Sequence, residues 1–259
     1  MKLIVFLVVF YSVASSVHAK TLILAYESKP NPPYYYGDGP HLESDTPGVT
    51  IEVLHRVAER FDIEFKFKRM TWVRVLDAVR ANQVDGIFHG SFKPERMKIG
   101  VYPMLDSQPD PTRQIMSQSY YLYKRKGAPI EWDGSKFHQI TGPIGITRGY
   151  SITYDLTAMG IEYEESVSQY VGLKKLQVDR VAGMVDLEGI TDPKLQLYQD
   201  EFTDVIKVSP PVKSKPYYLI FSHQFYSENT ELAEAIWQEI KAIRSSEEYG
   251  NISKKYLRD

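Results

Sequence analysis

Apolar positions along the first half of the chain alternate between a strand period and a helical period. Residues 21–26 form a short apolar run that stops where polar residues begin, which predicts a buried strand. Residues 49–61 place their apolar side chains on one helical face, and residues 63–67 alternate apolar with charged side chains, as a strand does. Thr71 can cap a following helix, and residues 85–90 predict the next strand.

The second half of the chain repeats this alternation. Residues 143–147 and 180–186 predict strands, and Ser151 is placed to open a helix. Residues 166–177 carry apolar side chains at helical spacing, and a final apolar stripe from Leu232 to Ile243 indicates a packed terminal helix. Strands that alternate with helices predict an α/β fold with mostly parallel sheets covered on both faces.

Two polar, proline-containing segments, 103–118 and 209–216, interrupt the alternation. Each is followed by a tyrosine pair and an apolar strand, so two strands are expected to cross between two lobes. The predicted division is a leader at 1–19, a discontinuous lobe 1 at 20–118 plus 213–259, and lobe 2 at 119–212.

The first 19 residues have the pattern of a secretory signal peptide. Lys2 is followed by an apolar run over 3–14 and by small residues before Lys20, the expected first residue of the mature protein. The run is shorter than the roughly 20 residues that span a bilayer. We therefore expect an exported, unanchored protein, located in the periplasm.

Composition excludes several classes of protein. The chain has 31 Lys plus Arg, 33 Asp plus Glu and no cysteine. A net charge of −2 provides no basic surface for nucleic acid. The absence of cysteine excludes disulfides, thiolate metal sites and a cysteine nucleophile. No histidines occur as H-x-H or H-x-x-x-H, so we expect no metal and no cofactor.

The order of segments resembles the extracytoplasmic solute-binding proteins of the polar amino acid type, which are the receptor components of ABC importers. The resemblance covers essentially the whole mature chain, and its order is more specific than any one segment. It implies a type II periplasmic-binding-protein fold, with two lobes that are each a mostly parallel sheet flanked by helices and joined by two hinge strands. The matching segments are LILAYESKPNPPYYY, PGVTIEVLHRVAERF, KFKRMTWVRVLDAVRANQVDGIFHGSFKPER, SYYLYKRKG, GPIGITRGYSITYDL and RVAGMVDLEGI.

A zwitterionic amino acid needs a cation for its carboxylate and an anion for its ammonium. Arg96 follows the strand at 85–90, at the end of a parallel sheet where ligands bind, and its guanidinium suits a carboxylate. The resemblance gives it that role, with Ser91 at the hydroxyl position beside it. The alternative for Arg96 is a surface ion pair with Glu95.

The ammonium partner implied by the resemblance is Asp186, at the end of the strand at 180–186. A helix N-cap is the alternative for this residue. Glu27 matches an acidic cleft position near the ammonium or the ligand side chain, with a solvated loop carboxylate as its alternative. The family more often has an acid where this chain has Ala182-Gly183, which is a departure on that side of the cleft.

Four further features complete the predicted cleft. Trp72 matches an aromatic residue that packs on the ligand, although burial in a core would also explain it. Thr147 and Ser151 flank the loop of lobe 2 that turns into a helix, where backbone N–H groups favour an anion. The tyrosines of 34–36 are expected to pack against their own lobe, where only one of them can easily face the cleft. His89, beside the cleft strand, is interpreted as a satisfied strand histidine, with ligand contact as its alternative.

The predicted function is capture of a small polar solute, most simply an amino acid, by a monomer that delivers it to a membrane permease of an ABC importer. One alternative is a receptor that reports to a membrane sensor kinase. The other is an enzyme: some relatives on this fold are dehydratases that use a cleft carboxylic acid, for which Glu27 is the candidate. No G-x-S-x-G motif occurs, and we predict no catalytic residue.

The segment between Arg96 and Tyr120 is longer than is usual in the family. We expect a loop at 104–114 near the cleft mouth. Either Asp106, Asp110 and Arg113 meet the ligand side chain there, or the loop is a surface insertion without ligand contact.

Overall fold

The computed structural model describes residues 19–41 and 45–256. The predicted signal sequence over 1–18 therefore lies outside the described residues. Among the described residues, none of the helices has both the length and the apolar character needed to cross a membrane.

One eight-stranded sheet runs through the molecule in the order β10-β9-β11-β6-β12-β3-β1-β2. Two further sheets have two strands each, β4-β5 and β7-β8. The strands are β1 Lys20–Glu27, β2 Ile63–Met70, β3 Gly86–Ser91, β4 Met104–Leu105, β5 Gln108–Pro109, β6 Met116–Arg125, β7 Glu131–Trp132, β8 Phe137–His138, β9 Ile144–Thr147, β10 Tyr163–Ser166, β11 Gly183–Leu187 and β12 Val205–Phe221. The helices are α1 Val49–Phe61, α2 Trp72–Arg80, α3 Ile152–Ala158, α4 Gln169–Gln177, α5 Glu188–Leu197, α6 His223–Glu228, α7 Thr230–Arg244 and α8 Glu247–Tyr256, with 3₁₀ turns η1 Pro94–Lys98 and η2 Pro111–Arg113.

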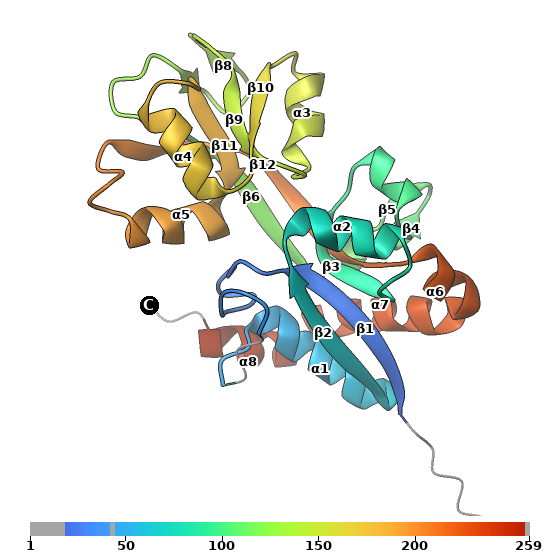
Figure 1. The fold of residues 1–259 in the computed structure, drawn as a ribbon. Coiled ribbons are helices and arrows are strands. Elements are labelled where there is room, and N and C mark those ends of the chain that lie inside the picture. Colours follow the sequence, from blue (N-terminus) through green and yellow to red (C-terminus); the bar gives the residue numbers. More distant parts are fainter. Residues whose placement is uncertain (1–18, 42–44, 257–259) are drawn as a thin grey trace, which may run out of the picture.

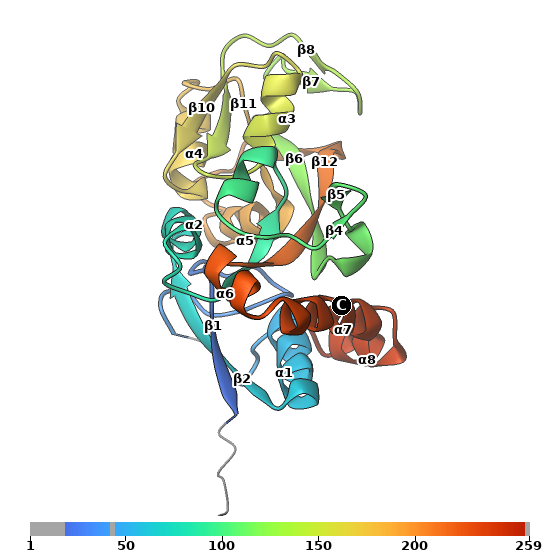
Figure 2. The same cartoon turned by 90° about the vertical axis from the view of Figure 1, so that its right-hand side faces the viewer.

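The long strands β6 and β12 pair antiparallel and join two groups of elements (Figure 1). On one side β1 pairs parallel with β2 and β3, and on the other β9 pairs parallel with β10 and β11. This confirms the predicted α/β architecture of the type II periplasmic-binding proteins. Figure 2 shows α1, α7 and α8 side by side at the end of the first group. The lobe boundaries at 118/119 and 212/213 fall inside β6 and β12, and we propose that these strands are the hinge.

The predicted bounds of α1 agree with the structure at both ends. The strand predicted at 180–186 was wrong at its start, since β11 begins at Gly183, and the segment 209–216, predicted to precede a strand, lies inside β12. The helix predicted from residue 166 was wrong at its start: α4 begins at Gln169, because the Ser168 hydroxyl accepts the Val171 N–H and caps it there. Val167 lies before this cap and is 64% exposed. Thr71 and Ser151 occupy N-cap positions, but neither side chain makes a capping hydrogen bond.

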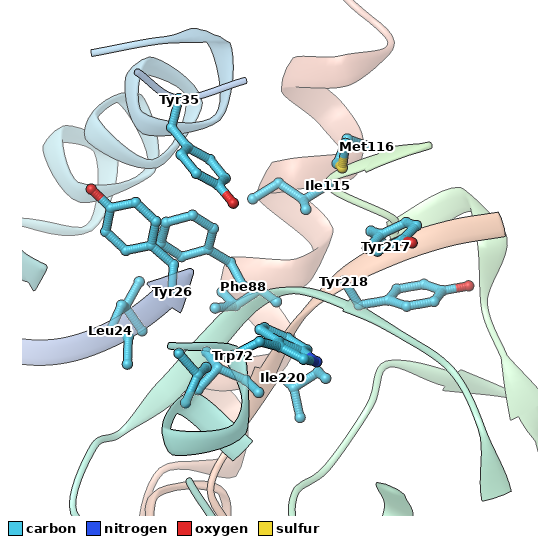
Figure 3. Packing of buried hydrophobic residues seen from close by; sticks show 14 of the residues in the cluster. Leu24, Tyr26, Tyr35, Trp72, Phe88, Ile115, Met116, Tyr217, Tyr218 and Ile220 are labelled. Carbon is cyan, nitrogen blue, oxygen red and sulfur yellow. The ribbon is translucent and has the colours of Figure 1, made fainter. Parts of the chain in front are cut away.

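Aromatic side chains fill the core beneath the carboxyl ends of β1 and β3. Tyr26 stacks on Phe88 with ring centroids 4.5 Å apart, and Tyr35 meets Tyr26 edge-on at 5.0 Å. In Figure 3, Tyr35, Trp72 and Tyr217 approach this cluster from three separate segments of the chain. Such pairs restrict the movement of the rings, so this core gives rigid support to the residues at the carboxyl ends of β1 and β3.

Candidate functional site

A cavity lies between the two groups of elements, at the carboxyl ends of β1 and β3. Ligands bind at this edge of open parallel sheets. Its lining mixes two charged side chains, several neutral polar groups and a majority of aromatic and apolar surfaces. The lining residues are Glu27, Asn31, Tyr35, Trp72, His89, Ser91, Arg96, Gln118, Tyr120, Tyr150, Ser151, Leu187, Ile190 and Tyr217.

Arg96 in η1 is 3% exposed and reaches across the cavity. Its Nη1 donates to the carbonyl oxygen of Ser91 at 2.6 Å, and its Nη2 donates to the carbonyl oxygen of Gly149 at 2.7 Å. The guanidinium also lies 5.4 Å from the ring centroid of Trp72. The alternative of a surface ion pair with Glu95 is therefore wrong, because Arg96 is buried and its partners are two backbone carbonyls and the Ser91 hydroxyl.

Two serines from different groups of elements meet at the cavity. The hydroxyls of Ser91 and Ser151 lie 2.6 Å apart, and Lys215 of β12 donates to the Ser151 hydroxyl at 3.3 Å. Lys215 forms an ion pair with Asp155 of α3. One hydrogen-bonded network thus joins β12, the start of α3 and the end of β3.

Glu27 ends β1 and is 5% exposed. One carboxylate oxygen accepts the backbone N–H of Trp72 at 3.2 Å. Burial raises the pKa of Glu27 to about 7, and nearby Lys29 opposes that shift. The solvated-loop alternative is wrong, since the carboxyl group is buried and lines the cavity.

Asp186 is completely buried but does not line the cavity. One oxygen accepts the Thr147 hydroxyl at 2.5 Å, and the other accepts the Leu187 N–H at 2.7 Å. Burial raises the pKa of Asp186 to about 6. The N-cap alternative is wrong, because the cap of α5 is Leu187. Thr147 lines an adjoining groove together with Glu27 and Trp72.

The structure thus brings Glu27, Trp72, Ser91, Arg96 and Ser151 together around one cavity, with Thr147 and Asp186 just behind its wall. Trp72 is buried, with 7% of its surface exposed, and it also lines the cavity. Burial in the core and a position at the cleft, the two interpretations of this residue, are therefore compatible. Ligand contact by all seven residues stays a prediction.

Sequence reasoning missed most of the neutral lining. Gln118 donates to Asn31 at 2.6 Å, and the hydroxyls of Tyr120 and Tyr217 lie 3.1 Å apart. The tyrosine pairs that follow the two proline-containing segments were a usable signal, because each hinge strand delivers one of them to the site. Tyr35 is the member of 34–36 that lines the cavity.

The segment at 104–114 forms a hairpin of β4 and β5 followed by η2. Asp110 accepts the Thr112 N–H, and Arg113 pairs with Glu234 of α7 at 2.6 Å. None of its residues is among the described residues that line the cavity. Of the two alternatives, the structure favours an insertion without ligand contact.

Replacement of 104–114 by a Gly-Ser link should therefore leave the order of ligand preference unchanged. It should lower the free energy of unfolding by about 1–2 kcal/mol, because the Arg113–Glu234 pair is lost and the link gains conformational freedom. Calorimetric ranking and urea denaturation of both proteins check this. If the shortened protein prefers a different ligand, the segment 104–114 does contribute to ligand specificity.

Among residues 19–41 and 45–256, no cluster of three or more histidine, aspartate or glutamate side chains could hold a metal ion. The chemistry that this part of the chain offers at the cavity is hydrogen bonding, two ionisable groups of opposite sign and aromatic packing.

The order of strands and the crossing pair β6 and β12 define a type II periplasmic-binding protein. Residues 22–259 match the family model described as bacterial extracellular solute-binding proteins, family 3, and the chain belongs to this family. No curated protein matches it.

Several solved structures share the fold at low sequence identity. A histidine kinase sensor domain with similarity to periplasmic binding proteins is 14% identical, with a TM-score of 0.69, over 93% of this chain and 97% of its own. An ancestral arginine-binding protein bound to glutamine is 15% identical, with a TM-score of 0.67, over 92% and 98%. A substrate-binding protein of an ABC uptake transporter from Streptococcus pneumoniae, with bound histidine, is 16% identical, with a TM-score of 0.65, over 92% of each chain.

Proposed function

We propose that this protein captures a small polar solute, most simply an amino acid, in the cavity between its lobes. The observation that carries the proposal is that buried Arg96 and buried Glu27 line the same cavity. A guanidinium suits the ligand carboxylate, and Glu27 or the recessed Asp186 suits its ammonium. Charge pairs of this kind are strong where water is excluded.

Contacts between the lobes support capture by closure. The Arg96–Gly149, Ser91–Ser151 and Trp72–Gly149 hydrogen bonds each join an element of the β1–β3 group to the loop before α3. A ligand that bridges the same groups would couple its affinity to closure. Similar structures described as bound to glutamine, arginine or histidine support the amino acid class.

Isothermal calorimetry of the purified protein against the common amino acids, small dicarboxylates, amines and sugars tests the proposal. We expect saturable binding of at least one amino acid, recovered chemically unchanged from the complex. Binding of a sugar or a simple dicarboxylate alone would overturn the ligand class, and chemical turnover of the ligand would favour the dehydratase alternative.

The proposed location is outside the cytoplasmic membrane, after removal of the leader, and the proposed partner is an ABC permease. A membrane sensor kinase is the second candidate, favoured by the likeness to the histidine kinase sensor domain. Crosslinking of the ligand-loaded protein to native membranes, followed by identification of the captured protein, separates the two partners.

A further inference from the structure

His89 lies in β3, two residues before Ser91, and lines the cavity. It is 6% exposed, and its backbone has a φ of 64°, which is left-handed. A non-glycine residue rarely adopts this conformation inside a strand, and such strained residues cluster at functional sites. The position therefore needs an explanation beyond packing.

The protonation of the ring follows from its single hydrogen bond. His89 Nε2 lies 2.8 Å from the hydroxyl of Thr50, which is 1% exposed and has no other side-chain partner among the described residues. If Nε2 carried the proton, the buried hydroxyl proton of Thr50 would be left without an acceptor, which is costly. Thr50 therefore donates to Nε2, and the proton of the neutral ring is on Nδ1.

Nδ1 is buried and has no hydrogen-bond partner among the described residues, so the interpretation of His89 as a satisfied strand histidine was wrong. Nearly all buried polar atoms in folded proteins are paired, so an unpaired donor beside a cavity points to a ligand atom. Rings on either side limit other partners: the centroid of Tyr35 lies 5.1 Å from that of His89, and that of Phe88 lies at 5.3 Å.

We propose that His89 determines specificity by donating a hydrogen bond from Nδ1 to an acceptor oxygen on the ligand side chain. The inference rests on the proposed function, in which Arg96 holds the ligand carboxylate. It narrows the ligand class to solutes that carry a second acceptor, such as an amide, hydroxyl or carboxylate oxygen, beyond the α-carboxylate. Purely aliphatic amino acids would leave Nδ1 unpaired.

The ring acts as a neutral donor and not as a cation. Burial lowers the pKa of His89 to about 3, because the charged ring would lose its hydration. The titratable and charged groups lining the same cavity are Glu27, Arg96 and the tyrosines. Recognition by His89 should therefore not require a negative charge on the ligand side chain.

Calorimetry with pairs of amino acids that match in shape tests the proposal: asparagine against leucine, and threonine against valine. We expect the wild-type protein to prefer the acceptor-bearing member of at least one pair by about 10- to 100-fold, as an unpaired buried donor implies. His89→Gly suits the left-handed backbone and removes the donor, so this preference should fall to nearly 1-fold. His89→Asn tolerates the same backbone, carries an amide donor and should restore part of the preference.

His55→Asn is the matched control, because His55 is exposed on α1 and does not line the cavity. Its preference should equal that of the wild-type protein. Equal affinity of the wild-type protein for both members of every pair, or an unchanged preference in His89→Gly, would overturn the role of His89 while the proposed function stands. Absence of binding to every amino acid would overturn both.

A second measurement needs no ligand. The ¹⁵N NMR shifts of the histidine rings at pH 7 should show His89 as neutral, with the proton on Nδ1, and His89→Gly identifies the signal. A proton on Nε2, or a charged ring, would contradict the donor assignment.

Discussion

Arg96→Ala should weaken ligand binding by about 2–5 kcal/mol, as the loss of one partner of a buried charge pair does. Arg96→Lys should recover only part of this, because an ammonium lacks the planar fork that meets both carboxylate oxygens. Arg96 is 3% exposed, and its guanidinium donates to two backbone carbonyls and to the hydroxyl of Ser91. Among the described residues, no carboxylate forms an ion pair with it. Calorimetry with the best amino acid ligand gives the comparison.

Arg80→Ala is the matched control for this prediction, because Arg80 pairs with Asp77 on the surface of α2 and its side chain is 57% exposed. Its affinity should equal that of the wild-type protein. In the absence of ligand, Arg96→Ala should change the free energy of unfolding much less than it changes the free energy of ligand binding. Water in the cavity can form hydrogen bonds with the carbonyl groups that Arg96 no longer contacts. Wild-type affinity in Arg96→Ala would place the carboxylate anchor elsewhere.

Glu27→Gln should stabilise the protein without ligand at pH 8 and weaken ligand binding at the same pH. The pKa of Glu27 is raised from 4.5 to about 7 by burial. Below pH 4.5 both folded and unfolded states are protonated. Between pH 4.5 and 7 the folded state retains a proton that the unfolded state has released, so stability falls as pH rises. Above pH 7 the cost of the buried charge is constant, on the order of 3 kcal/mol.

The neutral glutamine side chain of this variant carries no such cost and can still accept the Trp72 N–H. The free energy of unfolding of Glu27→Gln should exceed that of the wild-type protein at pH 8 and equal it at pH 4. A ligand ammonium favours the ionised form of Glu27, so wild-type affinity should fall as pH drops from 8 to 5. Glu27→Gln should remove most of that dependence, with a remainder from Asp186, whose pKa is about 6.

Denaturant melts and calorimetry at pH 4, 5, 7 and 8 check both parts of this prediction. Glu59→Gln is the control, since the Glu59 side chain is 64% exposed on α1 and pairs with Arg56. It should change neither the pH dependence of stability nor that of binding. If Glu27→Gln destabilises the protein at pH 8, the carboxylate makes a favourable structural contact and its role in binding the ammonium is contradicted.

The sequence alone determined the elements and their order. Hydrophobic periodicity is a local property, so α1 could be predicted at both ends, and the strand at 85–90 was placed within one residue of β3. The type II periplasmic-binding fold also followed, because the order of segments is written along the chain. Arg96 and Glu27 each follow a predicted strand, but their roles at the ligand were implied by the resemblance to the family.

Only the tertiary structure decided which groups share the cavity. Asp186 ends its strand as predicted, but Thr147 and the Leu187 N–H occupy its oxygens, and the first of these contacts joins residues 39 positions apart. Gln118, Tyr120 and Tyr217 line the site because the antiparallel pair β6 and β12 passes beside it. Arg113 does not line the site and instead pairs with Glu234 of α7. The position of His89 beside the cleft strand could be read from the sequence, but its unpaired Nδ1 depends on Thr50, which lies on another element. These contacts join residues that are far apart in the sequence, and the local pattern of apolar and polar residues carries no information about them.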